Sequence, residues 1–168
     1  MDRLTIESTS PDETRAAGRL LAKALFPGAC IALYGDLGAG KTVLAGGVIH
    51  GIGVPDETPV TSPTFVIISE YEGRLAVHHV DAYRLSGEAD ILELGSRELF
   101  FEEAVSVIEW AERIEGAIPD ERLSVKMTVS GSESRHIEVT AKGSAHVKAL
   151  GEFASSLAGD SKDKTETA

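Results

Sequence analysis

The chain has 168 residues, 42% of them apolar, and 27 acidic against 16 basic residues give it a formal net charge of −11. This length and composition predict one soluble globular domain, and basic residues too scattered to form a patch argue against direct tight binding to RNA or DNA. Because no apolar run approaches the roughly 18 residues of a membrane span, no signal-peptide pattern opens the chain and Cys30 is the single cysteine, we expect a cytoplasmic protein with no membrane contact and no disulfide framework.

The first two predicted elements are an edge strand and a helix. Residues 4–7 alternate between apolar and polar side chains, as a short strand does. Ser10 then stands where a helix N-cap would, followed by Pro11 in the first turn and Glu13 at the capping-box position. We expect the helix to end at residues 26–28, because the proline there cannot continue it.

The next stretch carries the most specific motif of the chain. Residues 30–34 form an apolar run of strand length, and residues 41–52 place apolar side chains at helical spacing. Between them the phosphate-loop pattern G-x-x-x-x-G-K-[ST] is complete. Its residues are Gly35, Asp36, Leu37, Gly38, Ala39, Gly40, Lys41 and Thr42. Glycines let backbone N–H groups curl around phosphate oxygens, Lys41 would reach the β- and γ-phosphates, and Thr42 would place its hydroxyl on Mg²⁺.

The remaining chain alternates between hairpins and short helices. A loop at 54–63, rich in Pro, Thr, Asp and Ser, leads into a predicted β-hairpin of residues 65–71 and 75–81. The later expected elements are short helices around Gly95, a buried strand at 105–109, a brief helix at 111–114, a second hairpin at 123–129 and 135–140, and a helix at 146–157. The small polar residues 160–168 favour a disordered tail.

These elements together predict an α/β fold. We expect a three-layer, P-loop NTPase-like domain whose central sheet is mixed, mainly parallel, and extended by antiparallel hairpins. The predicted domain spans residues 1–143, and residues 144–168 are assigned to the C-terminal helix and tail.

Two acids at predicted strand ends could complete a nucleotide site, because ligands of α/β folds bind outside the carboxyl ends of the strands. Glu109 ends a short, mostly apolar strand and is the better candidate for the Mg²⁺ ligand. Asp81 ends a strand that carries His78 and His79, which is less typical of a central strand. Asp81 is therefore expected to lie outside the metal's direct ligands, or to orient or activate the attacking water. For both acids the alternative is a solvated strand end.

Composition alone does not decide the role of the two adjacent histidines or of the hydroxyl-rich loop. His78 and His79 point to opposite faces of their strand, so they cannot both serve one site; one is expected in the core or an interface, and no metal cluster is implied. Ser62 and Thr64 flank Pro63 on a loop where nucleotide hydrolases keep a segment that senses the γ-phosphate. A turn shaped by Pro63 would explain the same composition.

The amino acids that are missing narrow the nucleotide class. The chain contains neither Asn nor Gln, so it has no Asn-Lys-x-Asp motif to read guanine and no Ras-type glutamine to position water. ATP is therefore favoured. Small-molecule kinases usually clamp the transferred phosphoryl group with several arginines on a lid, whereas Arg84, Arg97 and Arg113 are isolated. An ATP hydrolase or accessory factor fits better, and a nucleotide-gated binding module with negligible turnover remains the alternative.

Three further segments, together with the phosphate loop, follow the order and spacing of one family. They are Thr61-Ser62-Pro63-Thr64-Phe65, His79-Val80-Asp81-Ala82-Tyr83-Arg84-Leu85 and Ile108-Glu109-Trp110-Ala111-Glu112. Over residues 4–140 the chain resembles the TsaE family, the small bacterial ATPases of tRNA threonylcarbamoyladenosine (t6A) biosynthesis. The resemblance implies ATP hydrolysis that supports threonylcarbamoylation of adenosine 37 in tRNAs that read ANN codons. It also implies TsaD and TsaB as the partners that perform the transfer, with any tRNA contact of this chain indirect or weak.

The resemblance also implies roles for individual residues. The phosphate loop would bind ATP, Thr42 and Glu109 would hold Mg²⁺, and Trp110 would lie beside the site. Asp81 matches the family's other functionally important acid, and the loop from Ser62 to Thr64 matches its switch-like segment. The catalytic residues implied are Lys41, Asp81 and Glu109.

The chain departs from the family pattern at a few positions. Val80 and Ala82 replace bulkier residues, so the packing of the first hairpin is expected to differ. The family often has a basic residue near the nucleotide at the start of the last hairpin, but here Glu133 stands there and Arg135 follows two residues later, so that contact is not assigned. The adenine is expected near residues 9–13.

Overall fold

The computed structural model describes residues 1–63, 67–95, 99–100 and 103–166. Within them the strands are β1 (Arg3–Ser8), β2 (Cys30–Tyr34), β3 (Ile68–Glu72), β4 (Ala76–Asp81), β5 (Val105–Glu109), β6 (Leu123–Val129) and β7 (Arg135–Ala141). The helices are α1 (Pro11–Ala22), α2 (Lys41–Gly51), α3 (Glu88–Glu93), the 3₁₀ helix η1 (Ala111–Ala117) and α5 (Ser144–Glu166). Residues 65 and 66 of the predicted first hairpin lie outside the described residues.

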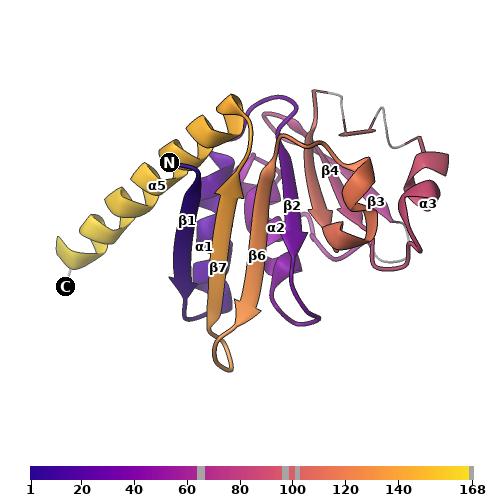
Figure 1. Ribbon diagram of the computed structural model, residues 1–168. Coiled ribbons are helices and arrows are strands. Elements are labelled where there is room, and N and C mark those ends of the chain that lie inside the picture. Colours follow the sequence, from indigo (N-terminus) through magenta and orange to yellow (C-terminus); the bar gives the residue numbers. More distant parts are fainter. Residues whose placement is uncertain (64–66, 96–98, 101–102, 167–168) are drawn as a thin grey trace.

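All these strands form one mixed sheet in the order β1-β7-β6-β2-β5-β4-β3 (Figure 1). The central strands β6, β2, β5 and β4 are parallel to one another. β7 pairs antiparallel with β6 and β1, and β3 pairs antiparallel with β4. The predicted α/β fold with a parallel centre and antiparallel hairpins at its sides is confirmed, and β1 is at an edge as expected.

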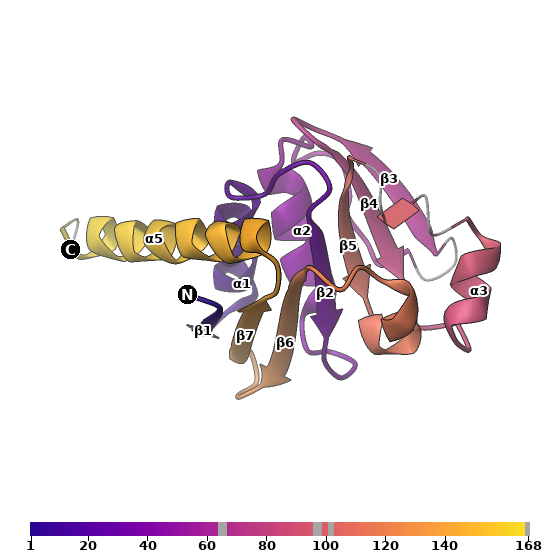
Figure 2. The same ribbon diagram turned by 45° about the horizontal axis from the view of Figure 1, so that its top comes forward.

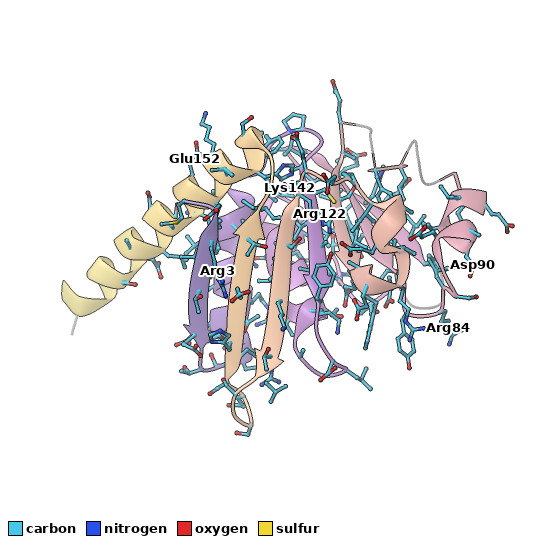
Figure 3. All side chains as sticks on the ribbon, viewed as in Figure 1. Arg3, Arg84, Asp90, Arg122, Lys142 and Glu152 are labelled. Atoms are coloured by element: carbon cyan, nitrogen blue, oxygen red, sulfur yellow. The ribbon has the colours of Figure 1, made fainter. Side chains whose placement is uncertain are left out.

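Alternating side chains of the central strands build two separate cores, one on each face of the sheet. Ile31 and Leu33 of β2 pack with α1 and α2, which lie behind the sheet in Figure 1. Cys30 and Ala32 face the other way and pack with the segment around α3 and η1. The result is the predicted three layers. The outer part of the sheet, formed by β1, β7 and β6, presents polar side chains such as Arg3 on its front face (Figure 3).

Helix α1 begins as the sequence predicts and ends earlier. Ser10 is the N-cap, and its hydroxyl accepts a hydrogen bond from the backbone N–H of Glu13 at 3.1 Å. The Glu13 carboxylate accepts from the N–H of Thr9 at 2.7 Å. The regular helix ends at Ala22, and i→i+3 turns carry the chain on to Leu25. Arg74 from the β3–β4 turn donates to the carbonyl of Leu25 at 3.3 Å, which satisfies one of the groups that a helix end leaves open.

Helices α1 and α2 approach so closely that glycines are needed at their contact. A Cβ atom on Gly47 would lie 2.3 Å from the carbonyl oxygen of Arg15, and one on Gly18 would lie 2.6 Å from that of Leu44. Both contacts are with backbone, which cannot rotate away. The glycines therefore fix the distance between α1 and α2, and α2 carries Lys41 and Thr42 at its first turn.

Helix α5 corrects one prediction of the sequence. It begins at Ser144 and continues to Glu166, so the described residues after 160 are helical and not a disordered tail. Leu150 and Phe153 anchor its first half in the core, and its second half projects beyond the sheet (Figure 2). Because this end contains no proline, each added residue extends a helix that is already nucleated. None of the described helices is long and apolar enough to span a membrane.

Candidate functional site

The phosphate loop connects β2 to α2, the context that the motif requires. Gly38 and Gly40 have φ angles of 80° and 97°, in the left-handed region that side chains disfavour. Gly40 is the N-cap of α2, so the first N–H groups of the helix are left to bind a ligand. The loop therefore brings the first N–H groups of α2 together with the positive end of the helix dipole, which is the usual cradle of a phosphate.

Lys41 is held inside the loop that it belongs to. Its ammonium donates to the carbonyl of Gly35, and to that of Asp36 at 3.0 Å. It also lies 3.9 Å from the centre of the Trp110 ring, a cation–π contact. Burial lowers the pKa of Lys41, and the nearby carboxylate of Glu109 opposes that shift. A buried cation whose partners are neutral backbone carbonyls is suited to exchange them for charged phosphate oxygens.

Glu109 stands between Thr42 and His79. The Thr42 hydroxyl donates to Oε1 of Glu109 at 2.7 Å. Nε2 of His79 lies 2.6 Å from Oε2 of the same carboxylate. Glu109 and His79 are both buried, with residue exposures of 2% and 0%. The glutamate is thus a fixed carboxylate at the first turn of α2 and not a solvated strand end.

Asp81 is fixed in a similar way. The hydroxyl of Ser62 donates to Oδ2 of Asp81, and the backbone N–H of Tyr83 donates to Oδ1 at 2.8 Å. Asp81 is 2% exposed, which excludes a solvated strand end for this acid as well. Through Ser62 the carboxylate is coupled to the loop that precedes β3. Thr64, the other hydroxyl predicted for that loop, lies outside the described residues.

The sheet register brings the two acids together. β4 and β5 are adjacent and parallel, and Asp81 is the register partner of Glu109. Both residues end their strands, so both carboxylates lie at the carboxyl edge of the sheet. β5 is also paired with β2, whose carboxyl end opens into the phosphate loop. Three neighbouring parallel strands therefore deliver the loop and both acids to one edge.

These groups surround a cavity of about 500 Å³. Its lining residues are Leu37, Gly38, Ala39, Gly40, Lys41, Thr42, Val43, Ser62, Asp81, Tyr83, Glu109, Trp110 and Arg135. Of the predicted loop residues, Gly35 and Asp36 lie outside this lining and face a neighbouring hollow beside β6. The structure thus brings both predicted acids, Ser62 and Trp110 to the phosphate loop.

Three lining or adjoining residues were not predicted. His79 shares its strand face with Asp81, two positions later, and this period-2 relation was a signal in the sequence. Arg135 donates to the carbonyls of Ala39 and Gly38 at 3.0 and 3.1 Å, so it clamps the phosphate loop onto the β6–β7 hairpin. Tyr83 places its ring 4.9 Å from that of Trp110. The contacts of His79, Arg135 and Tyr83 depend on strand pairing and turn geometry, which short sequence motifs do not encode.

The donor atoms beside the loop fit Mg²⁺. A threonine hydroxyl and a carboxylate are the hard oxygen ligands that this ion prefers. The 2.7 Å between Thr42 Oγ1 and Glu109 Oε1 is close to the roughly 2.9 Å expected between neighbouring ligands of an octahedral Mg²⁺ shell. Thr42 and Glu109 can therefore occupy two adjacent positions of one shell, with the remainder left to water and phosphate oxygens.

Comparison with known proteins places this geometry in a family. Residues 8–137 match the family model described as "Threonylcarbamoyl adenosine biosynthesis protein TsaE". The chain is 40% identical to the TsaE protein of Bacillus subtilis over 144 residues, which are 85% of this chain and 89% of that protein. It is 35% identical to the Treponema pallidum TsaE protein over 132 residues, 79% of this chain and 96% of the relative. Both relatives carry the name "tRNA threonylcarbamoyladenosine biosynthesis protein TsaE".

A solved structure agrees with the sequence comparison. The structure titled "Crystal structure of Bacillus subtilus YdiB" superposes with a TM-score of 0.79 at 35% sequence identity. The match covers 90% of this chain and 94% of that one. The similarity therefore covers most of the chain, and not the phosphate-loop motif alone.

Proposed function

We propose, from the premise that this chain belongs to the TsaE family, that it binds and hydrolyses ATP in support of tRNA t6A biosynthesis. The family role in t6A biosynthesis follows from the match over residues 8–137. We further propose that the nucleotide is ATP, that Mg²⁺ is its counter-ion, and that this chain works together with TsaD and TsaB.

One observation carries the proposal of hydrolysis. Lys41, Thr42, Glu109 and Asp81 come from three separate segments and converge on a single cavity beside the phosphate loop. A module that only gripped phosphate would need the loop, its lysine and an ion ligand. Asp81 adds a second buried carboxylate, oriented by two hydrogen bonds, which binding alone does not require.

The chain's own groups would bind the triphosphate as follows. The N–H groups of the loop and of the first turn of α2 would surround the β-phosphate, while Lys41 would turn from the carbonyls of Gly35 and Asp36 to phosphate oxygens. Thr42 and Glu109 would hold Mg²⁺, which neutralises charge on the β- and γ-phosphates when bound. Trp110 would cover Lys41 and exclude water from that side.

Asp81 would act on the attacking water. Its carboxylate would accept a hydrogen bond from that water and orient the oxygen toward the γ-phosphorus. The new P–O bond forms as the bond between the γ-phosphorus and the β–γ bridging oxygen breaks, leaving ADP and inorganic phosphate. The water's proton passes to Asp81 or to a phosphate oxygen. Because the Ser62 hydroxyl donates to Asp81, a shift of the Ser62 loop when the γ-phosphate binds would move or reorient the Asp81 carboxylate.

ATP is the nucleotide that the site favours. Without Asn, the chain lacks the usual motif that reads guanine. A smaller hollow of about 30 Å³, lined in part by Pro11, Thr14 and Val43, adjoins the loop beside Arg135. We place the adenine on this side, near the predicted stretch 9–13. The net charge of −11 supports an indirect role toward tRNA, with TsaD and TsaB making the main contacts.

Nucleotide binding and single-turnover hydrolysis, measured separately, test the proposal. The wild type should bind ATP more tightly than GTP in the presence of Mg²⁺. With TsaD and TsaB present, Asp81→Asn should keep ATP binding and lose about 10²–10⁴-fold in the rate of the chemical step, the usual contribution of a positioned acid–base group. Unchanged hydrolysis in both Asp81→Asn and Glu109→Gln would refute the catalytic assignment and leave a nucleotide-gated binding module. Tight selectivity for GTP would refute the choice of nucleotide.

A further inference from the structure

We propose that His79 is a positioning residue that orients the Glu109 carboxylate for Mg²⁺, an inference that rests on the proposed ATP site. The observation behind it is the buried chain of contacts Thr42–Glu109–His79, in which each carboxylate oxygen has its own partner, at 2.7 and 2.6 Å. In metal sites, groups behind the ligands hold those ligands in their binding orientation.

The hydrogen-bond partners identify the tautomer of His79. An ionised carboxylate only accepts, so Nε2 of His79 must carry the proton that it shares with Glu109. Nδ1 of His79 is buried and has no hydrogen-bond partner among the described residues. A lone pair at Nδ1 is less costly there than a buried N–H without an acceptor. An Nε2–H on His79 therefore fits both observations and is a donor aimed at Glu109.

This donor matters most when the site is occupied. In the structure Glu109 accepts from Thr42 and from His79. When Glu109 binds Mg²⁺ through Oε1, that oxygen is shared between the ion and the Thr42 hydroxyl, whereas Oε2 is held by His79. The contact from His79 remains and keeps Oε2 occupied, so Oε1 stays turned toward Thr42. Without it, a buried carboxylate whose outer torsion is soft would lose its defined orientation.

The neighbouring histidine provides a matched control. His78 is also buried, but it points to the opposite face of β4 and contacts the carbonyl of Leu99 at 3.3 Å and the carboxylate of Glu70 at 3.7 Å. Val77 belongs to the core on the α2 side and Val80 to the other, which places His79 and Asp81 on the α2 side and His78 away from it. Substitutions at 78 and 79 therefore disturb the same strand from different sides.

The experiment measures Mg²⁺ dependence separately from nucleotide affinity. Binding of the fluorescent nucleotide mant-ADP is titrated first in EDTA and then with increasing Mg²⁺, for wild type, His79→Leu, His79→Gln and His78→Leu. We expect His79→Leu to raise the Mg²⁺ concentration needed for half-maximal enhancement of binding by about 10–100-fold, with affinity in EDTA unchanged. His79→Gln, whose amide N–H lies near the position of Nε2, should restore most of the Mg²⁺ response. His78→Leu should match the wild type.

A double-mutant cycle tests whether His79 acts through Glu109. In a Glu109→Ala background, His79→Leu should cause no further loss of Mg²⁺ response. A full additional loss there, or a wild-type response in His79→Leu itself, would overturn the inference.

A measurement on the wild-type protein keeps the inference testable if His79→Leu does not fold. Imidazole ¹⁵N shifts should report an Nε2–H tautomer for His79, and these shifts should change when Mg²⁺ is added to the mant-ADP complex, while those of His78 stay constant. A His79 ring that is Nδ1–H, or that does not respond to Mg²⁺, would overturn the inference alone. A wild-type protein that binds no mant-ADP would refute the proposed function and the inference with it.

Discussion

The close contact between α1 and α2 predicts that Gly47→Ala destabilises the protein, whereas helix propensity alone predicts that it stabilises. In a helix interior, Gly→Ala ordinarily stabilises by about 0.8–1 kcal/mol. At Gly47 the new Cβ would stand 2.3 Å from the carbonyl oxygen of Arg15, a backbone atom of the facing helix. Relief requires the helices to move apart, and overpacking of this kind costs about 1–3 kcal/mol or more. Because the clash is with backbone, we take about 4 kcal/mol, which leaves Gly47→Ala about 3 kcal/mol less stable than wild type.

Gly46 provides the control on the same helix. A Cβ there would meet Val60 side-chain atoms at 3.9 Å, an ordinary van der Waals distance. Thermal unfolding should show Gly47→Ala melting about 6–12 °C below wild type and Gly46→Ala about 2–4 °C above it, at roughly 2–4 °C per kcal/mol for a chain of this size. An alanine at 47 that is neutral or stabilising would refute the close approach of the helices. Equal destabilisation at both positions would show that the cost does not come from contact with α1.

Three further predictions follow from contacts in the structure. Burial raises the pKa of the Cys30 thiol to about 12, so Ellman's reagent at pH 8 should leave native protein unmodified and label it after unfolding; rapid labelling of the native state would contradict the burial. Burial lowers the pKa of His146. Its Nε2 accepts a hydrogen bond from the N–H of Cys30 at 3.2 Å. The imidazole of His146 therefore takes up a proton at higher pH in the unfolded chain than in the folded one. Stability should therefore fall as pH drops below about 6.5, with a smaller fall in His146→Gln, and equal pH profiles would refute this coupling. Arg135→Met removes the two donors that hold Gly38 and Ala39 and should weaken ATP binding by about tenfold, on the order of one charged hydrogen bond; isothermal titration checks this against Glu133→Gln, and equal affinities would contradict the clamp.

Much of the fold could be predicted because its signals are local. The glycine spacing of residues 35–42, the Ser10 cap and the alternation in both hairpins each lie within a few consecutive residues. Helix ends differ from the prediction, since α1 stops at Ala22 and α5 continues to Glu166. Cooperative extension and packing, and not composition alone, set those ends.

The sequence predicts the site residues that end strands. It does not predict the site residues whose contacts depend on which strands pair. Asp81 and Glu109 could be selected because acids after apolar strands reach the carboxyl edge of a sheet. The contact of His79 with Glu109 depends on the pairing of β4 with β5, and that of Arg135 with the phosphate loop depends on the fold of the last hairpin. No short segment of the sequence specifies such long-range strand pairing. The separation of α1 from α2, set by Gly18 and Gly47, is of the same kind.

The proposed function requires this chain to turn over ATP at the phosphate loop in concert with TsaB and TsaD. ATP turnover, measured with and without TsaB and TsaD for wild type and Lys41→Ala, tests it most directly. We expect slow wild-type hydrolysis that rises when both partners are added, and a loss of about 10²–10³-fold in Lys41→Ala, the usual effect of removing one preorganised charge-stabilising group. Wild-type turnover that does not respond to the partners, or Lys41→Ala turnover equal to wild type, would contradict the account.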